Sequence, residues 1–191
     1  MRSLRYLPVL VLLFAAGLSR AALAQEAEAP APDAAAPQFV NAFSTLHRFS
    51  NLGHWPRGGV ALDANGNIFG TTLYGGNCST CGVIYELVKP TAAGRPYTFR
   101  SLHNFVLGPD GIAPTAPLRI VNGKIYGTTS AGANPSCGCG EVFRLVPSGS
   151  GYAYQVLHRF DRTRGTTPIG GVLVGSTGTI IGTASGGGAN S

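Results

Sequence analysis

Three histidines stand at the same point of a repeated phrase, and histidine is the residue most often used to bind transition metals or transfer protons. His47, His103 and His158 each lie in the phrase Leu-His-x-Phe, first 56 and then 55 residues apart. Three neutral imidazoles could hold a metal ion. Side chains alternate along a strand, however, and this alternation puts each histidine on the face that also carries aromatic residues such as Phe99 and Tyr154. We therefore predict hydrogen-bonded core histidines that pack against a neighbouring unit, and no metal site.

The four cysteines are the second candidate group. They occur as Cys78-x-x-Cys81 and Cys137-x-Cys139, in glycine-rich loops at matching places of the repeat. In an exported protein such pairs favour disulfides over zinc. One local disulfide per loop is the simplest pairing. A C-x-C bridge closes a tight ring, so pairing between the loops is the alternative, and a four-cysteine zinc site is a further alternative.

The carboxylates are too scattered to suggest catalysis. The folded part contains five, none of which recurs in register or neighbours another in sequence: Asp63, Glu86, Asp110, Glu141 and Asp161. An enzyme needs a nucleophile, an acid–base pair or a metal. The segment 63–67 has some features of a calcium loop but lacks the remaining acidic ligands, and a hairpin turn explains it. We predict no catalytic residue and no cofactor.

Short strands must position all of these residues. Each unit of about 55 residues consists of apolar alternations broken by turn residues, without helical periodicity. Asn65-Gly66 and Asn122-Gly123 predict hairpins with type I′ turns, and Thr177-Gly178 stands at the same point of the third unit. Four antiparallel strands per period are typical of a propeller blade. We predict an all-β fold, a partial β-propeller of about two and a half four-stranded antiparallel blades, with a β-solenoid such as a parallel β-helix as the alternative.

Composition divides the chain into three parts. Residues 1–24 combine basic residues, a short apolar stretch and a small-residue cleavage pattern, which together predict a secretory signal peptide. Residues 25–38 are an Ala/Pro/acidic linker that we expect to be disordered. Residues 39–191 form the β-repeat domain, in which an aromatic strand at 43–49 is expected to precede the first unit. The units span about 46–101, 102–156 and 157–191, the last being incomplete.

Three in-register copies of one phrase also suggest a family. The first two copies contain Leu-His-x-Phe, then G-[KN]-I-[FY]-G-T-T, a glycine-rich loop with cysteine, and G-x-[IV]-[FY]-x-L, and the third contains Leu-His-Arg-Phe and then GTIIGTA. This phrase resembles the GloVer tandem repeat over residues 45–191. The resemblance implies an exported bacterial protein with a propeller-like fold, no established activity and no catalytic motif. We expect no surface-anchoring tail of the kind that proteins of that family usually bear, which would be a departure from the family.

The sequence favours a non-enzymatic exported repeat protein that acts as a surface or extracellular interaction module. We expect it to be secreted, periplasmic or on the cell surface, with an unknown extracellular ligand, a glycan or a protein. The net charge of +6 comes from scattered bases, so no nucleic-acid partner is expected. No membrane span is expected after signal cleavage. An incomplete ring exposes apolar faces, which predicts either a homo-oligomer that completes the ring or a poorly soluble chain.

Two other functions stay open at this point. The first is a propeller-type carbohydrate-active hydrolase or lyase whose site needs a complete ring, since the fold alone does not exclude catalysis. The second is a truncated fragment without independent function.

Overall fold

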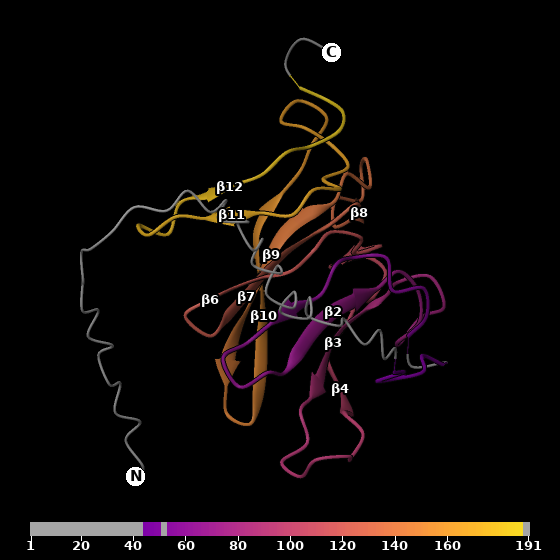
Figure 1. Ribbon diagram of the computed structural model, residues 1–191. Coiled ribbons are helices and arrows are strands. Elements are labelled where there is room, and N and C mark those ends of the chain that lie inside the picture. The colour runs from indigo at the N-terminus through magenta and orange to yellow at the C-terminus, as the bar shows by residue number, and fades with distance from the viewer. Residues whose placement is uncertain (1–43, 51–52, 189–191) are drawn as a thin grey trace, which may run out of the picture. The chain divides into compact units, whose positions relative to one another are not determined.

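The computed structural model describes residues 44–50 and 53–188 (Figure 1). Within these residues the fold is all-β and contains no helix. The expected signal peptide, residues 1–24, and the expected linker, residues 25–38, lie outside the described residues. In the described part, no helix is long and apolar enough to cross a membrane.

Two four-stranded antiparallel sheets form the body of the fold. The first sheet has the order β1-β2-β3-β4, with bounds Ala61–Leu62, Ile68–Thr72, Val83–Val88 and Thr98–Asn104. The second has the order β6-β7-β9-β10, with bounds Arg119–Val121, Lys124–Thr129, Glu141–Ser148 and Gly151–Arg159. In both sheets each strand pairs with the next strand of its own sheet, as in a propeller blade. The predicted all-β fold of antiparallel sheets is confirmed.

Two smaller ladders complete the described strands. The third unit contributes a hairpin of β11 (Leu173–Val174) and β12 (Ile180–Ile181), and the second unit contains a ladder of β5 (Gly111–Ile112) and β8 (Ala131–Gly132). All pairs of named strands are antiparallel, so the described residues lack the parallel coils of a β-helix. In Figure 1 the colour passes from the purple first sheet through the orange second sheet to the yellow hairpin. The described sheets form no closed ring, which fits a partial propeller.

The main hydrophobic core lies between the two large sheets. Its buried members come from both units: Phe69, Cys81, Ile84, Phe105, Leu118, Ile125, Phe143 and Leu145. Burying a large apolar side chain stabilises a fold by about 1.5–3 kcal/mol, so this cluster holds the two sheets together. Gly127 makes room for it, because a Cβ at this position would lie 2.5 Å from the ring of Phe143.

The hairpin turns differ between units. Asn122 and Gly123 both have positive φ, 50° and 71°, as a type I′ turn requires. At Asn65-Gly66 only the glycine has a positive φ, of 82°, and its N–H donates to the Asp63 carbonyl at 3.1 Å. The type I′ prediction is therefore wrong for this turn, which is a longer loop closed by a left-handed glycine. The carboxylate of Asp63 accepts two backbone N–H groups of this loop and holds it in shape.

The expected strand ahead of the first unit is absent from the described residues. Residues 44–50 have no strand conformation, and residues 39–43 lie outside the described part. The segment still packs against the first sheet, because the ring of Phe49 lies 5.0 Å from the ring of Tyr85 and at right angles to Phe99. The prediction of a strand is wrong for residues 44–50, because no strand among the described residues pairs with them. The packing of Phe49 against Tyr85 and Phe99 does not depend on strand pairing.

A β-bulge changes the face of the histidines. On β4, Ser101 pairs with Tyr85 of β3 and His103 pairs with Ile84, so Leu102 is an extra residue. Leu157 is the corresponding extra residue of β10. One inserted residue reverses the alternation of side chains. The prediction that the histidine shares a face with the aromatic residues earlier in its strand is therefore wrong: the two halves of each fourth strand serve opposite faces.

Candidate functional site

Two of the three repeated histidines, His47 and His103, stack on an aromatic ring of the next four-stranded sheet along the chain. The ring of His47 lies 4.9 Å from that of Phe99, at an interplanar angle of 16°. The ring of His103 lies 4.0 Å from that of Tyr154, at an angle of 6°. Phe99 and Tyr154 occupy the same position in β4 and β10, so both contacts are copies of one arrangement. For His103 the bulge of β4 makes this possible, since it turns the ring toward the second sheet.

His103 also belongs to a polar cluster between the two sheets. Its Nε2 lies 2.9 Å from Oδ2 of Asp110. On the far side of the stacked ring, the Tyr154 hydroxyl donates to Oε1 of Glu141. The backbone N–H of Gly111 donates to the same oxygen at 2.7 Å. Glu141 is fully buried, and Arg159 Nε approaches its other oxygen to 3.8 Å.

Burial dominates the electrostatics of this cluster. It raises the pKa of the Glu141 carboxyl above the ordinary value, although the bonds from Tyr154 and Gly111 act in the opposite direction. Burial, followed by the neighbouring Glu141 carboxylate, strongly raises the pKa of the Tyr154 phenol. Burial lowers the pKa of His103, and Asp110 opposes this shift. The phenol therefore remains protonated and can donate its hydrogen bond to Glu141 at any physiological pH.

The cluster gathers acid–base groups that look scattered in the sequence. Asp110 and Glu141 belong to different segments of the chain and meet only because the second sheet packs on the end of β4. Each group is engaged by another member or by backbone, and Glu141 has no exposed surface. This arrangement ties the two sheets together. It gives no open position for a substrate beside Glu141.

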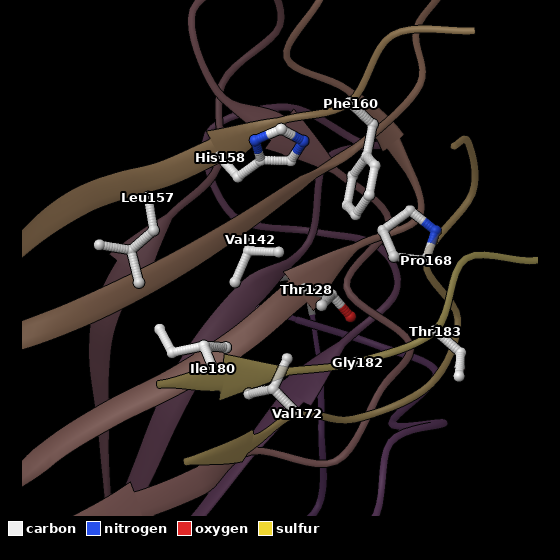
Figure 2. Close-up of a pocket in the computed structure, with 10 residues that line it drawn as sticks. All are labelled: Thr128, Val142, Leu157, His158, Phe160, Pro168, Val172, Ile180, Gly182 and Thr183. Atoms are coloured by element: carbon white, nitrogen blue, oxygen red, sulfur yellow. The ribbon is translucent and has the colours of Figure 1, made fainter. Parts of the chain in front are cut away.

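An open cavity lies on the other side of the second sheet. It has a volume of about 300 Å³ and a largely apolar lining. Figure 2 shows His158 and Phe160 along one side, Val172 and Ile180 of the third unit along the other, and Val142 between them. The complete lining is Thr128, Val142, Leu157, His158, Phe160, Pro168, Val172, Ile180, Gly182 and Thr183.

Residues that line this cavity occupy the same repeat positions as residues of the main core between the two large sheets. Val142 stands at the repeat position of Ile84, and Ile180 stands at that of Ile125. Ile84 and Ile125 lie in the main core, where the ring of Phe143 fills the space between the sheets. The hairpin of the third unit supplies one wall of the cavity, but the described residues supply no third strand with a counterpart of Phe143. The cavity therefore corresponds to the space between the two large sheets, except that among the described residues no side chain fills it as Phe143 does there.

The surroundings of His158 differ from those of its repeat equivalent, His103. Its ring lies 4.8 Å from the ring of Phe160, as His103 lies beside Phe105, but it stacks on no aromatic ring of the described residues. Among the described residues it also lacks an acidic neighbour at the place of Asp110, where the third unit has Arg164. His158 therefore presents one face of its ring to the cavity wall without the partners that His103 has.

Comparison with known proteins agrees with the repeat pattern. The model of a family described as Gloeobacter/Verrucomicrobia repeat matches residues 36–191. The chain belongs to the Gloeobacter/Verrucomicrobia repeat family. This confirms the GloVer resemblance. Neither the curated proteins nor the solved structures contain a significant match to this chain.

The cysteines of this repeat-family chain pair locally. Cys78 is joined to Cys81 and Cys137 to Cys139, with Cα–Cα distances of 5.5 and 5.2 Å. Neither pairing between the loops nor a four-cysteine zinc site occurs. Among the described residues, no group of three or more His, Cys, Asp or Glu side chains lies close enough to hold a metal ion.

Proposed function

We propose that the protein is an exported, non-enzymatic interaction module that associates head to tail through the faces of its repeat units. The open cavity beside His158 carries the proposal, because its walls match an interface that the same chain fills with its own aromatic side chains. A family of bacterial repeat proteins and two disulfides support a location outside the cytoplasm.

The partner is a second copy of this chain. The cavity is flanked by Leu-His-Arg-Phe, residues 157–160, and the identical tetrapeptide at residues 46–49 covers Tyr85 and Phe99 of the first sheet. Residues 46–49 are not held by strand pairing. Residues 157–160 of one copy can therefore take their place on the first sheet of the next copy. Such a contact is heterologous, and repeated contacts of this kind close into a ring or extend into a filament.

The polar cluster supports a non-enzymatic role. Its carboxylates and its histidine form hydrogen bonds or ion pairs within the fold. Glu141 is fully buried, so a substrate cannot contact it in this arrangement. The apolar cavity contains a histidine but no carboxylate to serve as its partner. Shape and hydrophobic contact are therefore what the open face offers.

Sedimentation of the purified chain over a range of concentrations tests the proposal. We expect reversible association in the micromolar range. Ile180→Arg places a charge in the cavity wall and should give a monomer, whereas Leu173→Arg alters an exposed residue of the same hairpin outside the cavity and should leave association unchanged. A synthetic peptide of residues 44–50 should bind the first sheet in place of residues 157–160 of another copy and so compete with association. A wild-type chain that stays monomeric, or two variants that behave alike, would contradict the proposal.

A further inference from the structure

An aromatic cluster with one exposed ring lies in the first unit and shares no residue with the cavity. The ring of Trp55 lies 5.3 Å from the ring of Tyr74, and the ring of His54 lies 5.7 Å from the same tyrosine. The guanidinium carbon of Arg57 lies 5.5 Å from the centre of the Trp55 ring. Trp55 is 56% exposed. We call His54, Trp55, Arg57 and Tyr74 the aromatic platform.

The backbone beneath the platform recurs in all three units. Trp55, Ala113 and Thr167 each precede a proline and have φ values of 60°, 56° and 55°. The carbonyl of each accepts a hydrogen bond from the facing segment, at 3.0, 3.1 and 3.2 Å. This left-handed conformation is therefore a property of the repeat and not of the first unit alone.

The side chains on this backbone are special to the first unit. The equivalents of the four platform residues are Ile112, Ala113, Thr115 and Ala131 in the second unit and Thr166, Thr167, Ile169 and Gly186 in the third. A bulky residue with positive φ is strained. Trp55 recovers little of this strain by burial because more than half of its surface is exposed. Fold stability does not account for the platform, whereas a ligand that covers the rings would.

The charge around the platform favours an anionic ligand. Each of the five carboxylates of the described residues is engaged within the fold: Asp63, Glu86, Asp110, Glu141 and Asp161. Among the described residues, Arg57 has no carboxylate within ion-pair distance. The chain carries a net charge of +6. A guanidinium beside the exposed ring of Trp55 can therefore pair with a carboxylate of the ligand.

We propose that the platform binds an acidic polysaccharide. The flat C–H face of a pyranose ring stacks on the exposed ring of Trp55, the tilted and half-buried ring of Tyr74 beside it adds a second contact to the sugar chain, and a uronate carboxylate pairs with Arg57. An acidic peptide would satisfy Arg57 but would leave the two flat rings without matching surfaces. The site lies within one copy of the chain, so it does not depend on association through the cavity.

The fluorescence of Trp55 reports this binding directly, because it is the single tryptophan of the chain. Oligogalacturonate should change its emission saturably. The methyl-esterified oligomer keeps the sugar rings without the charge and should bind about fivefold more weakly, the factor expected for one exposed ion pair. Polyglutamate should cause no saturable change. The association-deficient Ile180→Arg variant should bind like the wild type, which separates this site from the proposed assembly.

Variants assign the roles within the platform. Arg57→Gln should abolish the preference for the acidic over the esterified oligomer, whereas Arg119→Gln, a change at an exposed arginine of the second unit, should preserve it. Tyr74→Ala should weaken both ligands, with far-UV circular dichroism confirming the fold. The absence of an emission change with either oligomer, equal binding of polyglutamate, or an unchanged preference in Arg57→Gln would overturn the proposal.

Discussion

Replacing Tyr154 with phenylalanine should destabilise the fold through one lost hydrogen bond. The Tyr154 hydroxyl donates to Glu141, which has no exposed surface. Losing a donor to a buried charged group costs about 2–3 kcal/mol. The stacking on His103 should survive, because Phe99 stacks under His47 at the same repeat position. The loss is therefore assigned to the hydroxyl alone, and it corresponds to a fall in Tm of about 4–12 °C for a domain of this size.

Urea unfolding followed by far-UV circular dichroism measures this effect. The matched control is Tyr85→Phe, since Tyr85 is 3% exposed and its hydroxyl makes no hydrogen bond to any described residue. The control should lose less than about 1 kcal/mol, as expected where no bonded partner is left behind. Equal losses in both variants, or an unchanged midpoint for Tyr154→Phe, would show that the Glu141 bond does not stabilise the interface.

Two further predictions concern the same interface. Burial lowers the pKa of His103 in the folded protein below the ordinary value of 6.5, so the unfolded chain binds a proton at this histidine more readily. The stability that neutral His103 contributes should therefore be lost as the pH falls below 6.5. In thermal melts, the Tm of His103→Gln should depend less on pH in this range than the Tm of the wild type. Gly127→Ala should lower the free energy of unfolding by about 1–3 kcal/mol, because the added Cβ overpacks Phe143. Gly151→Ala is the control and should be nearly neutral, because a Cβ there would meet nothing within 4 Å. Similar urea midpoints for the two variants would refute the packing argument.

The sequence predicts the features of this fold that depend on neighbouring residues. Alternation and turn residues act over a few positions, so the antiparallel sheets and their repeat are foreseeable. The bulge at Leu102 and Leu157 is not, because one extra residue is invisible to an alternation pattern yet reverses every side chain after it. The meeting of Asp110 with Glu141 depends on how two units pack, and no local pattern encodes it. Trp55 has a local signal, a bulky residue where the other units carry small ones, but the signal appears only when the units are aligned by structure.

The bulge also explains how the units join. In each fourth strand the residues before the bulge, such as Phe99, receive the histidine of the preceding segment, and the residues after it, such as His103, face the following unit. Each four-stranded sheet thus offers an aromatic ring on one face and a histidine on the other. Between the two sheets His103 stacks on Tyr154, so both groups have their partner within the chain. His158 instead faces the cavity, and Phe99 is covered by residues 46–49, which have the same tetrapeptide as residues 157–160. In the proposed assembly a second copy would fill both sites with contacts that the chain already uses once between its two sheets.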